Sequence, residues 1–171
     1  MIVTVELHQI MLDIAEKYAN FRRDYNCLVH IGDGLEYIKR LNDDEKFDLI
    51  IQDGCASTPC DLLTLDSLKT MSNLLSPHGI YIQNLINMSK HRGVVRNLQD
   101  SFKELYYVES KSVNQVLVGY NHDKVFNVDE LTVRGEQFQS QENPQFDLVN
   151  EYSSQFKRLT NVMINCENYK E

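Results

Sequence analysis

Three acidic residues each follow a short apolar run, and this pattern constrains the fold of the 171-residue chain more than any other feature. The runs are residues 3–5 before Glu6, residues 27–31 before Asp33 and residues 47–52 before Asp53. In an open α/β sheet, ligands bind outside the carboxyl ends of the strands. We therefore predict that the three carboxylates can face one pocket.

A nucleotide-binding sheet of this kind carries a glycine-rich turn after its first strand. No such turn precedes the first apolar run here, because the given sequence has only Met1 and Ile2 before it. The pattern therefore predicts a nucleoside-binding fold whose first strand and phosphate-type loop are missing.

Composition excludes several classes of protein. The formal net charge of -8 argues against a non-specific nucleic-acid binder, which needs clustered basic residues. No run approaches the roughly 20 apolar residues that a membrane span requires. The four cysteines, Cys27, Cys55, Cys60 and Cys166, form no CxxC pair, and the five histidines are dispersed. We therefore expect reduced thiols in a cytoplasmic protein, with no metal site.

Strand-like and helix-like segments alternate along the chain, which predicts an α/β fold with a largely parallel sheet. We expect strands at residues 3–5, 28–31, 47–52 and 80–85, and helices at 10–18, 35–41, 62–75 and 94–102. The strand at 47–52 is nearly all apolar, as expected for one that is buried on both faces. Residues 105–109 and 113–120 are too close for a crossover helix and predict an antiparallel hairpin at one edge of the sheet. We divide the chain into a partial domain at 1–121 and a C-terminal helical appendix at 122–171.

Each acid also has a purely structural interpretation. Glu6 suits the paired hydroxyls of a ribose, but it could instead be an acid favoured at a helix N-terminus. Asp33, between Gly32 and Gly34, could accept a hydrogen bond from an adenine amino group, or it could cap the next helix. Asp53 could orient an amine or take its proton, or simply form an Asp-Gly turn.

Taken together, four segments resemble the class I S-adenosylmethionine-dependent methyltransferases, in their spermidine synthase-like branch. The segments are residues 5–7, 31–34, 47–53 and 74–81. Residues 82–86 and 112–117 make the chain most similar to the C-terminal domain of the elongation factor 1A lysine and N-terminal methyltransferases. The resemblance covers about residues 3–120 and implies a Rossmann-like sheet with S-adenosylmethionine as cofactor.

The resemblance also implies roles for individual residues. Glu6 would bind the ribose hydroxyls and Asp33 the adenine amino group, beside the backbone of Gly34. Leu7 and Leu35 would flank the adenine ring. Asp53 would face the methionine or the acceptor and is the catalytic candidate. The expected partner is a protein substrate such as elongation factor 1A.

The chain departs from the family pattern at two places. The GxGxG turn that holds the methionine part of the cofactor is absent, so a catalytically inactive binding module is an alternative to a methyltransferase. Residues 54–59 offer no further acid for a polyamine amine, which disfavours a third interpretation, an aminopropyltransferase.

The missing strand would lie between the strands that end at Glu6 and Asp53. Those strands could pair directly, or the molecule could self-associate through its open edges. We favour an incomplete gene product, and we expect the chain as given to have little or no methyltransferase activity.

Overall fold

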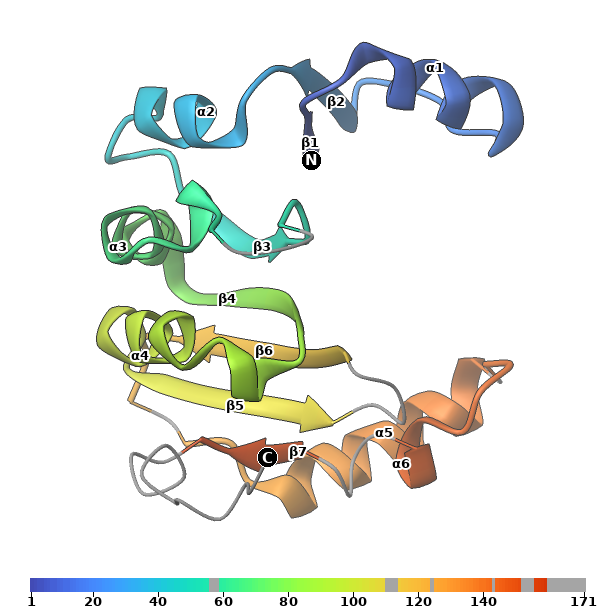
Figure 1. Cartoon of the computed structure of the whole chain (residues 1–171). Helices are drawn as coiled ribbons and strands as arrows, with labels where there is room; N and C mark the ends of the chain where they lie inside the picture. The colour runs from blue at the N-terminus through green and yellow to red at the C-terminus, as the bar shows by residue number, and fades with distance from the viewer. Residues whose placement is uncertain (56–58, 110–113, 124, 143, 152–155, 160–171) are drawn as a thin grey trace. The chain divides into compact units, whose positions relative to one another are not determined.

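A computed structural model gives the fold for residues 1–55, 59–109, 114–123, 125–142, 144–151 and 156–159. The chain divides into two compact units, Met1–Glu45 and Lys46–Glu171. Figure 1 shows the elements of both units. Each unit has a sheet of its own, so the described strands do not include a direct pairing of the first strand with the third.

The first unit contains two parallel strands, each followed by a helix, as the sequence predicts. These elements are β1 (Ile2–Glu6), α1 (Gln9–Tyr18), β2 (Cys27–Ile31) and α2 (Gly34–Arg40). The two strands pair in register from Ile2 opposite Cys27 to Glu6 opposite Ile31. Their carboxyl ends therefore meet at one edge of the sheet.

The first unit buries little apolar surface. Of its large hydrophobic side chains only Leu12 is buried, whereas Ile10 of the same helix is 61% exposed. The helix at residues 10–18 was predicted correctly, but most of its apolar side chains are not buried. A 45-residue unit with a two-stranded sheet is too small to form a sizeable core.

The second unit contains a five-stranded sheet in the order β3-β4-β6-β5-β7. Its elements are β3 (Phe47–Gln52), η1 (Asp61–Leu63), α3 (Leu65–Asn73), β4 (Leu75–Ile86), η2 (Met88–Lys90), α4 (Arg92–Ser101), β5 (Glu104–Glu109), β6 (Asn114–Tyr120), α5 (Val128–Glu142), α6 (Leu148–Glu151) and β7 (Phe156–Arg158). β3 and β4 are parallel, whereas β6 is antiparallel to both of its neighbours, β4 and β5.

The start of β4 differs from the prediction. The helix was expected to reach residue 75 and the strand to begin at 80, but β4 begins at Leu75. Phe47 pairs with Leu75, and the next pair joins Leu49 to Ile80, so residues 76–79 form an irregularity inside the strand. The Pro and Gly of this segment therefore mark a bulge-like irregularity and not a turn.

β3 is not buried on both faces, which corrects a second prediction. Leu49 is 49% exposed and Ile51 is 65% exposed, while the polar Gln52 is buried. Among the described strands β3 pairs with β4 alone, so it is an edge strand of its sheet. An edge strand has a neighbouring strand on one side only, so its apolar side chains have fewer neighbours and are more exposed than those of a central strand.

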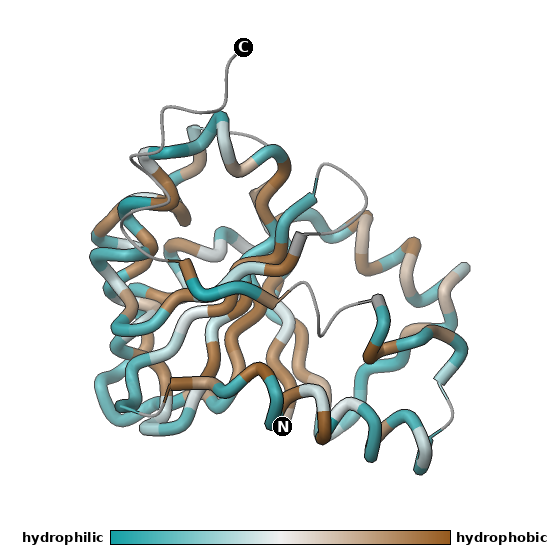
Figure 2. Tube along the Cα trace, turned by 90° about the horizontal axis from the view of Figure 1, so that it is seen from below, coloured by the Kyte–Doolittle hydropathy of each residue, from teal (hydrophilic) through white to brown (hydrophobic). Residues whose placement is uncertain are grey.

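The core of the second unit lies between its central strands and two helices. Figure 2 shows apolar residues concentrated along these strands. α3 and α4 pack side by side (Figure 1). The largest fully buried apolar side chains are Leu68, Tyr81, Leu98, Tyr106, Leu117 and Tyr120. Tyr81 stacks on Phe102 with ring centroids 4.8 Å apart. Phe102 in turn lies over Gly119, where an added Cβ would come within 2.7 Å of its ring.

The predicted hairpin of β5 and β6 is confirmed, although residues 110–113 between the strands lie outside the described part. The hairpin is not at the edge of the sheet, because β7 pairs with the outer side of β5. Arg158 of β7 donates a 2.7 Å hydrogen bond from Nε to Glu104 of β5. The C-terminal region thus contributes a strand as well as the helices α5 and α6. In the described ranges, no helix has the length and apolar character needed to cross a membrane.

Candidate functional site

Glu6 and Asp33 lie at the same edge of the first unit. Glu6 is the last residue of β1 and pairs with Ile31, the last residue of β2. The N–H of Gly32 donates a 2.9 Å hydrogen bond to the carbonyl of Glu6, which continues the pairing up to the residue before Asp33. The parallel pairing therefore brings together two of the three acids that the sequence singles out.

The Glu6 carboxylate has one oxygen engaged and one available. Oε1 accepts a 2.9 Å hydrogen bond from the backbone N–H of His8, which precedes α1. In the described part of the chain no hydrogen bond to Oε2 is found. The Oε1 bond ties Glu6 to His8, the N-cap residue of α1, and it leaves the second oxygen able to accept a ligand hydroxyl.

In Asp33, as in Glu6, only one of the two carboxylate oxygens bonds to the local backbone. It is the N-cap of α2, where Oδ1 accepts hydrogen bonds from the N–H groups of Leu35 at 2.7 Å and Glu36 at 3.2 Å. Its other oxygen, Oδ2, has no hydrogen-bond partner among the described residues, and the side chain is exposed. Capping and ligand binding would use different oxygens, so they are compatible.

The other predicted site residues of the first unit directly follow these acids in the sequence. Leu7 is exposed, and Leu35 is half-buried in the first turn of α2. Gly34 is the first residue of α2, so its N–H belongs to the open end of that helix. Such N–H groups are donors without a partner inside the helix, which suits the ring nitrogens of a base.

Asp53 belongs to the second unit and directly follows β3. Its Oδ1 accepts a 2.9 Å hydrogen bond from Nδ2 of Asn84 in β4. Gln52 and Gln83 are directly opposite in the parallel register, so Asp53 and Asn84 are the next pair along. Asn84 is a residue that sequence reasoning did not single out. The available signal was its place in the strand one residue beyond Gln83, as Asp53 is one residue beyond Gln52.

Hydrogen bonds connect three buried polar side chains next to Asp53, those of Tyr81, Gln83 and Gln52. Tyr81 donates a 2.6 Å hydrogen bond to Oε1 of Gln83, and Nε2 of Gln83 donates to Oε1 of Gln52 at 3.0 Å. Gln52 then donates from Nε2 to Sγ of Cys55 at 2.9 Å. Burial raises the pKa of the Tyr81 hydroxyl, so Tyr81 remains a neutral donor. These hydrogen bonds connect the interior of the sheet to Cys55, two residues after Asp53.

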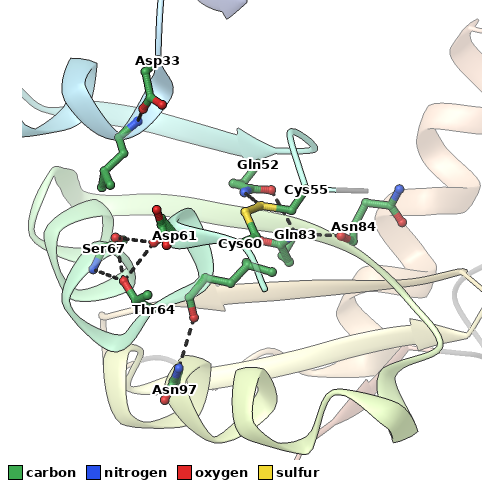
Figure 3. Close-up of a disulfide and its surroundings, with 12 residues drawn as sticks. Asp33, Gln52, Cys55, Cys60, Asp61, Thr64, Ser67, Gln83, Asn84 and Asn97 are labelled. Carbon is green, nitrogen blue, oxygen red and sulfur yellow. Dashed lines mark hydrogen bonds between the residues drawn. A yellow bond between two sulfur atoms is a disulfide. The ribbon is translucent and has the colours of Figure 1, made fainter. Parts of the chain in front are cut away.

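Cys55 and Cys60 form a disulfide, which corrects the expectation that both are reduced thiols (Figure 3). Their Cα atoms are 6.1 Å apart, within the range that a disulfide spans. From the sequence alone the two cysteines are only five residues apart, and nothing in it shows that the end of β3 and the start of η1 approach each other. Among the described residues, Cys27 is a free cysteine.

Two surface hollows are distinct from the predicted site residues. The larger, about 560 Å³, lies in the first unit and is lined by residues that include Val3, Arg23, Asp24 and Tyr37. The other, about 290 Å³, lies in the second unit between α4, β5 and β7. Neither contains any of the three acids, so the candidate site is defined by strand ends and not by a hollow.

Comparisons with known proteins agree with the predicted fold. The crystal structure of human methyltransferase-like protein 13 in complex with SAH is similar to this chain, with a TM-score of 0.73 and 23% sequence identity. The match covers 84% of this chain and 72% of that one. The predicted Rossmann-like methyltransferase sheet is therefore confirmed.

The relatives found by sequence include methyltransferases and an aminopropyltransferase. The eEF1A lysine and N-terminal methyltransferase homolog of Drosophila melanogaster is 27% identical over 141 residues, which are 75% of this chain and 21% of that protein. The chain thus spans about a fifth of the length of this relative. The polyamine aminopropyltransferase of Vibrio vulnificus (strain CMCP6) is 35% identical over 89 residues, 50% of this chain and 30% of that protein.

The family comparison covers most of the chain. Residues 1–128 match the family described as the spermine/spermidine synthase domain. This match includes both units' candidate residues, from Glu6 to Asn84, and it confirms the spermidine synthase-like branch that the sequence resembles. The chain belongs to the spermine/spermidine synthase domain family.

Proposed function

We propose that this chain is part of an S-adenosylmethionine-dependent methyltransferase that acts on protein amines in the cytoplasm. The observation that carries the proposal is the pair of carboxylates at the ends of β1 and β2. Each of them uses one oxygen to fix the local backbone and keeps the other oxygen available. Two such acceptors at adjacent strand ends suit the polar groups of an adenosine.

In this proposal the first unit holds the adenosine end of the cofactor. Glu6 accepts hydrogen bonds from the ribose hydroxyls, and Oδ2 of Asp33 accepts from the adenine amino group. Leu7 and Leu35 supply apolar contacts for the adenine ring, and the backbone N–H of Gly34 donates to one of its ring nitrogens. The donor and acceptor set of these residues therefore fits an adenosine.

Asp53 and Asn84 are proposed to serve the acceptor amine. S-adenosylmethionine supplies a methyl group on a sulfonium, which is already a strong electrophile, so the protein mainly has to position the nucleophile. Asp53 is exposed and can accept a hydrogen bond from an incoming amine. Asn84 fixes the Asp53 carboxylate through its 2.9 Å hydrogen bond and leaves Oδ2 for the amine.

The proposed substrate is elongation factor 1A. Support comes from relatives in several animals, including cattle, that are named eEF1A lysine and N-terminal methyltransferases. Aminopropyl transfer to a polyamine is the second candidate, because the bacterial relative is a polyamine aminopropyltransferase. A binding module without catalysis is the third, because the adenosine site alone would support binding without transfer.

Calorimetry with S-adenosylhomocysteine tests the adenosine site and separates it from helix capping. Asp33→Ala removes the cap and the ligand oxygen, whereas Asp33→Ser keeps a capping hydroxyl and removes only the second oxygen. A charge-assisted hydrogen bond contributes about 1.5–3 kcal/mol, so both variants should bind about tenfold or more weakly.

Asp24→Ala is the matched control for that experiment. Asp24 also accepts two backbone N–H groups, from Asn26 at 2.8 Å and Cys27 at 2.9 Å, but it precedes β2 instead of following it. The Asp24 variant should bind like the wild type. Wild-type affinity in Asp33→Ser would show that Asp33 is only a cap, and absence of binding to the wild-type chain would contradict the adenosine site.

Transfer assays distinguish the three candidate functions. Elongation factor 1A is incubated with the chain and S-adenosylmethionine carrying a radiolabelled methyl group, and putrescine with decarboxylated S-adenosylmethionine. Label in the protein supports the methyltransferase, and an aminopropylated product supports the second candidate. Because the chain as given is expected to have little or no activity, the same assays are run on a form of the protein extended upstream of residue 1. Binding of S-adenosylhomocysteine without either transfer in both forms supports a binding module.

A further inference from the structure

The Cys55–Cys60 disulfide has no role in the function proposed above. The two residues flank residues 56–59, between the end of β3 and the start of η1. Both residues are half-buried, so part of each is open to solvent. In a reducing compartment, a disulfide of this kind is usually transient and not structural.

Cys55 is held from the sheet side by contacts that do not depend on the disulfide. Gln52 donates to its Sγ at 2.9 Å, and Gln52 is itself fixed by Gln83 at 3.0 Å. Gln83 is fully buried and receives the Tyr81 hydroxyl at 2.6 Å. Rigid strand residues therefore position this sulfur in the oxidised and in the reduced form.

Cys60 is held from the helix side in a similar way (Figure 3). Its carbonyl accepts a 3.0 Å hydrogen bond from the N–H of Leu63, within η1. The next carbonyl, of Asp61, accepts the hydroxyls of Ser67 at 2.7 Å and Thr64 at 2.9 Å. The N-terminal cap of α3 thus anchors the start of η1.

We propose that Cys55 and Cys60 form a reversible redox site that exchanges with a low-molecular-weight thiol and its disulfide, such as glutathione. The two anchors keep the sulfurs within reach of each other after reduction, which gives them a high effective concentration. Reversible closure is therefore favoured over separate oxidation of either cysteine.

Reduction of the disulfide consumes two glutathione molecules. In reduction, one glutathione thiolate attacks Sγ of Cys60 and Cys55 leaves as a thiolate, which then takes up a proton. A second glutathione thiolate attacks the glutathione sulfur of the mixed disulfide, which releases Cys60 and forms oxidised glutathione. Two electrons pass from the two glutathione thiols to the protein disulfide, and their two protons end on Cys55 and Cys60.

The Gln52 side chain gives this exchange a direction. Its N–H points at Sγ of Cys55 and stabilises negative charge there, so Cys55 is the better leaving group. The incoming thiolate therefore attacks Cys60.

Equilibration of the full chain in glutathione buffers tests the proposal. After an acid quench and alkylation, peptide mass spectrometry measures thiol and disulfide at each cysteine. Cys55 and Cys60 should change together, from mostly reduced to mostly oxidised over about a hundredfold range of [GSH]²/[GSSG], as for a two-electron couple. Cys27 should show no intramolecular disulfide at any ratio.

Two outcomes would overturn the proposal. A pair that stays oxidised in excess reduced glutathione is a structural disulfide, and a pair that never closes in excess oxidised glutathione is not a redox site. Both measurements are independent of methyl transfer, so they remain informative if the proposed function is wrong.

Rapid acid quenching tests the direction of exchange. The transient mixed disulfide should be found on Cys60 in the wild type, as located by fragmentation spectra. In Gln52→Met the side chain keeps its length but loses the N–H, so the mixed disulfide should become distributed over both cysteines. The control is Gln99→Met, which changes a glutamine of α4 away from the pair. Equal distribution in the wild type would contradict the role of Gln52.

Discussion

Asn84 donates a 2.9 Å hydrogen bond to Asp53 one residue beyond the last backbone pair that joins the parallel strands β3 and β4. The contact joins residues 31 positions apart in sequence, and it exists because Gln52 and Gln83 are in register. It gives the exposed carboxylate of Asp53 a fixed orientation, which an Asp-Gly turn alone does not provide.

Exchanging the two side chains tests this contact. Asn84→Asp alone places two carboxylates in contact and should destabilise the protein at pH 7 by about 1 kcal/mol or more. Asp53→Asn alone should cost less, because it leaves two neutral amides. The double variant Asp53→Asn/Asn84→Asp restores an amide and a carboxylate and should recover most of the loss. Urea denaturation of all four proteins measures the coupling, and simple additivity would show that the contact is absent in solution.

Tyr81 should make stability depend on alkaline pH. Its pKa is raised by burial in the folded state, so the folded protein retains a proton that the unfolded chain releases above about pH 10. The stability associated with this proton is complete below pH 10 and declines as pH rises further. Tyr81→Phe should cost about 1–3 kcal/mol at pH 7, because Gln83 loses its donor.

The difference between wild type and Tyr81→Phe should therefore shrink as pH is raised from 9 towards 11. Thermal unfolding followed by circular dichroism across this range measures it. Tyr25 is 86% exposed, so Tyr25→Phe serves as the control and should leave the pH profile unchanged. A constant difference between wild type and Tyr81→Phe at every pH would contradict the buried hydroxyl.

Gly119 should not tolerate a side chain. It pairs with Tyr81 in the sheet, and an added Cβ would come within 2.7 Å of the Phe102 ring that stacks on Tyr81. Gly119→Ala should therefore destabilise the protein by about 1–3 kcal/mol through overpacking. Gly93 of α4 is the control, since an added Cβ there meets no atom within 4 Å. Gly93→Ala should leave stability unchanged or raise it by up to about 1 kcal/mol, because alanine favours helix.

Leu98 and Leu49 should differ in their contribution to stability although both are leucines of the second unit. Leu98 is completely buried on α4, so Leu98→Ala should cost about 2–5 kcal/mol. Leu49 is an exposed residue of β3, so Leu49→Ala should cost about 1 kcal/mol or less. Urea denaturation compares the two variants, and equal losses would show that β3 is covered in solution.

The sequence predicted the local elements well where one strong signal acts alone. The helix at residues 10–18, the Asp33 cap and the antiparallel hairpin follow from apolar periodicity, a capping residue and a short connection. The extension of β4 back to Leu75 was missed, because Pro77 and Gly79 are turn-forming in isolation and only pairing with β3 makes the segment a strand.

The long-range contacts were the hardest to predict. Pairing of β7 with β5 and the Asn84–Asp53 hydrogen bond each depend on how distant segments meet. Apolar periodicity carries no information on such meetings. The assignments of Glu6, Leu7, Asp33, Gly34, Leu35 and Asp53 to a ligand remain predictions.

On heating, residues 1–45 should unfold at a lower temperature than residues 46–171, in a separate transition. The smaller unit has one buried large hydrophobic residue, whereas the larger unit contains a continuous apolar core. Their unfolding is then not two-state, and a single melting temperature describes only the five-stranded sheet. Since Glu6 and Asp33 belong to the less stable unit, saturating S-adenosylhomocysteine should raise the lower calorimetric transition and leave the upper one in place.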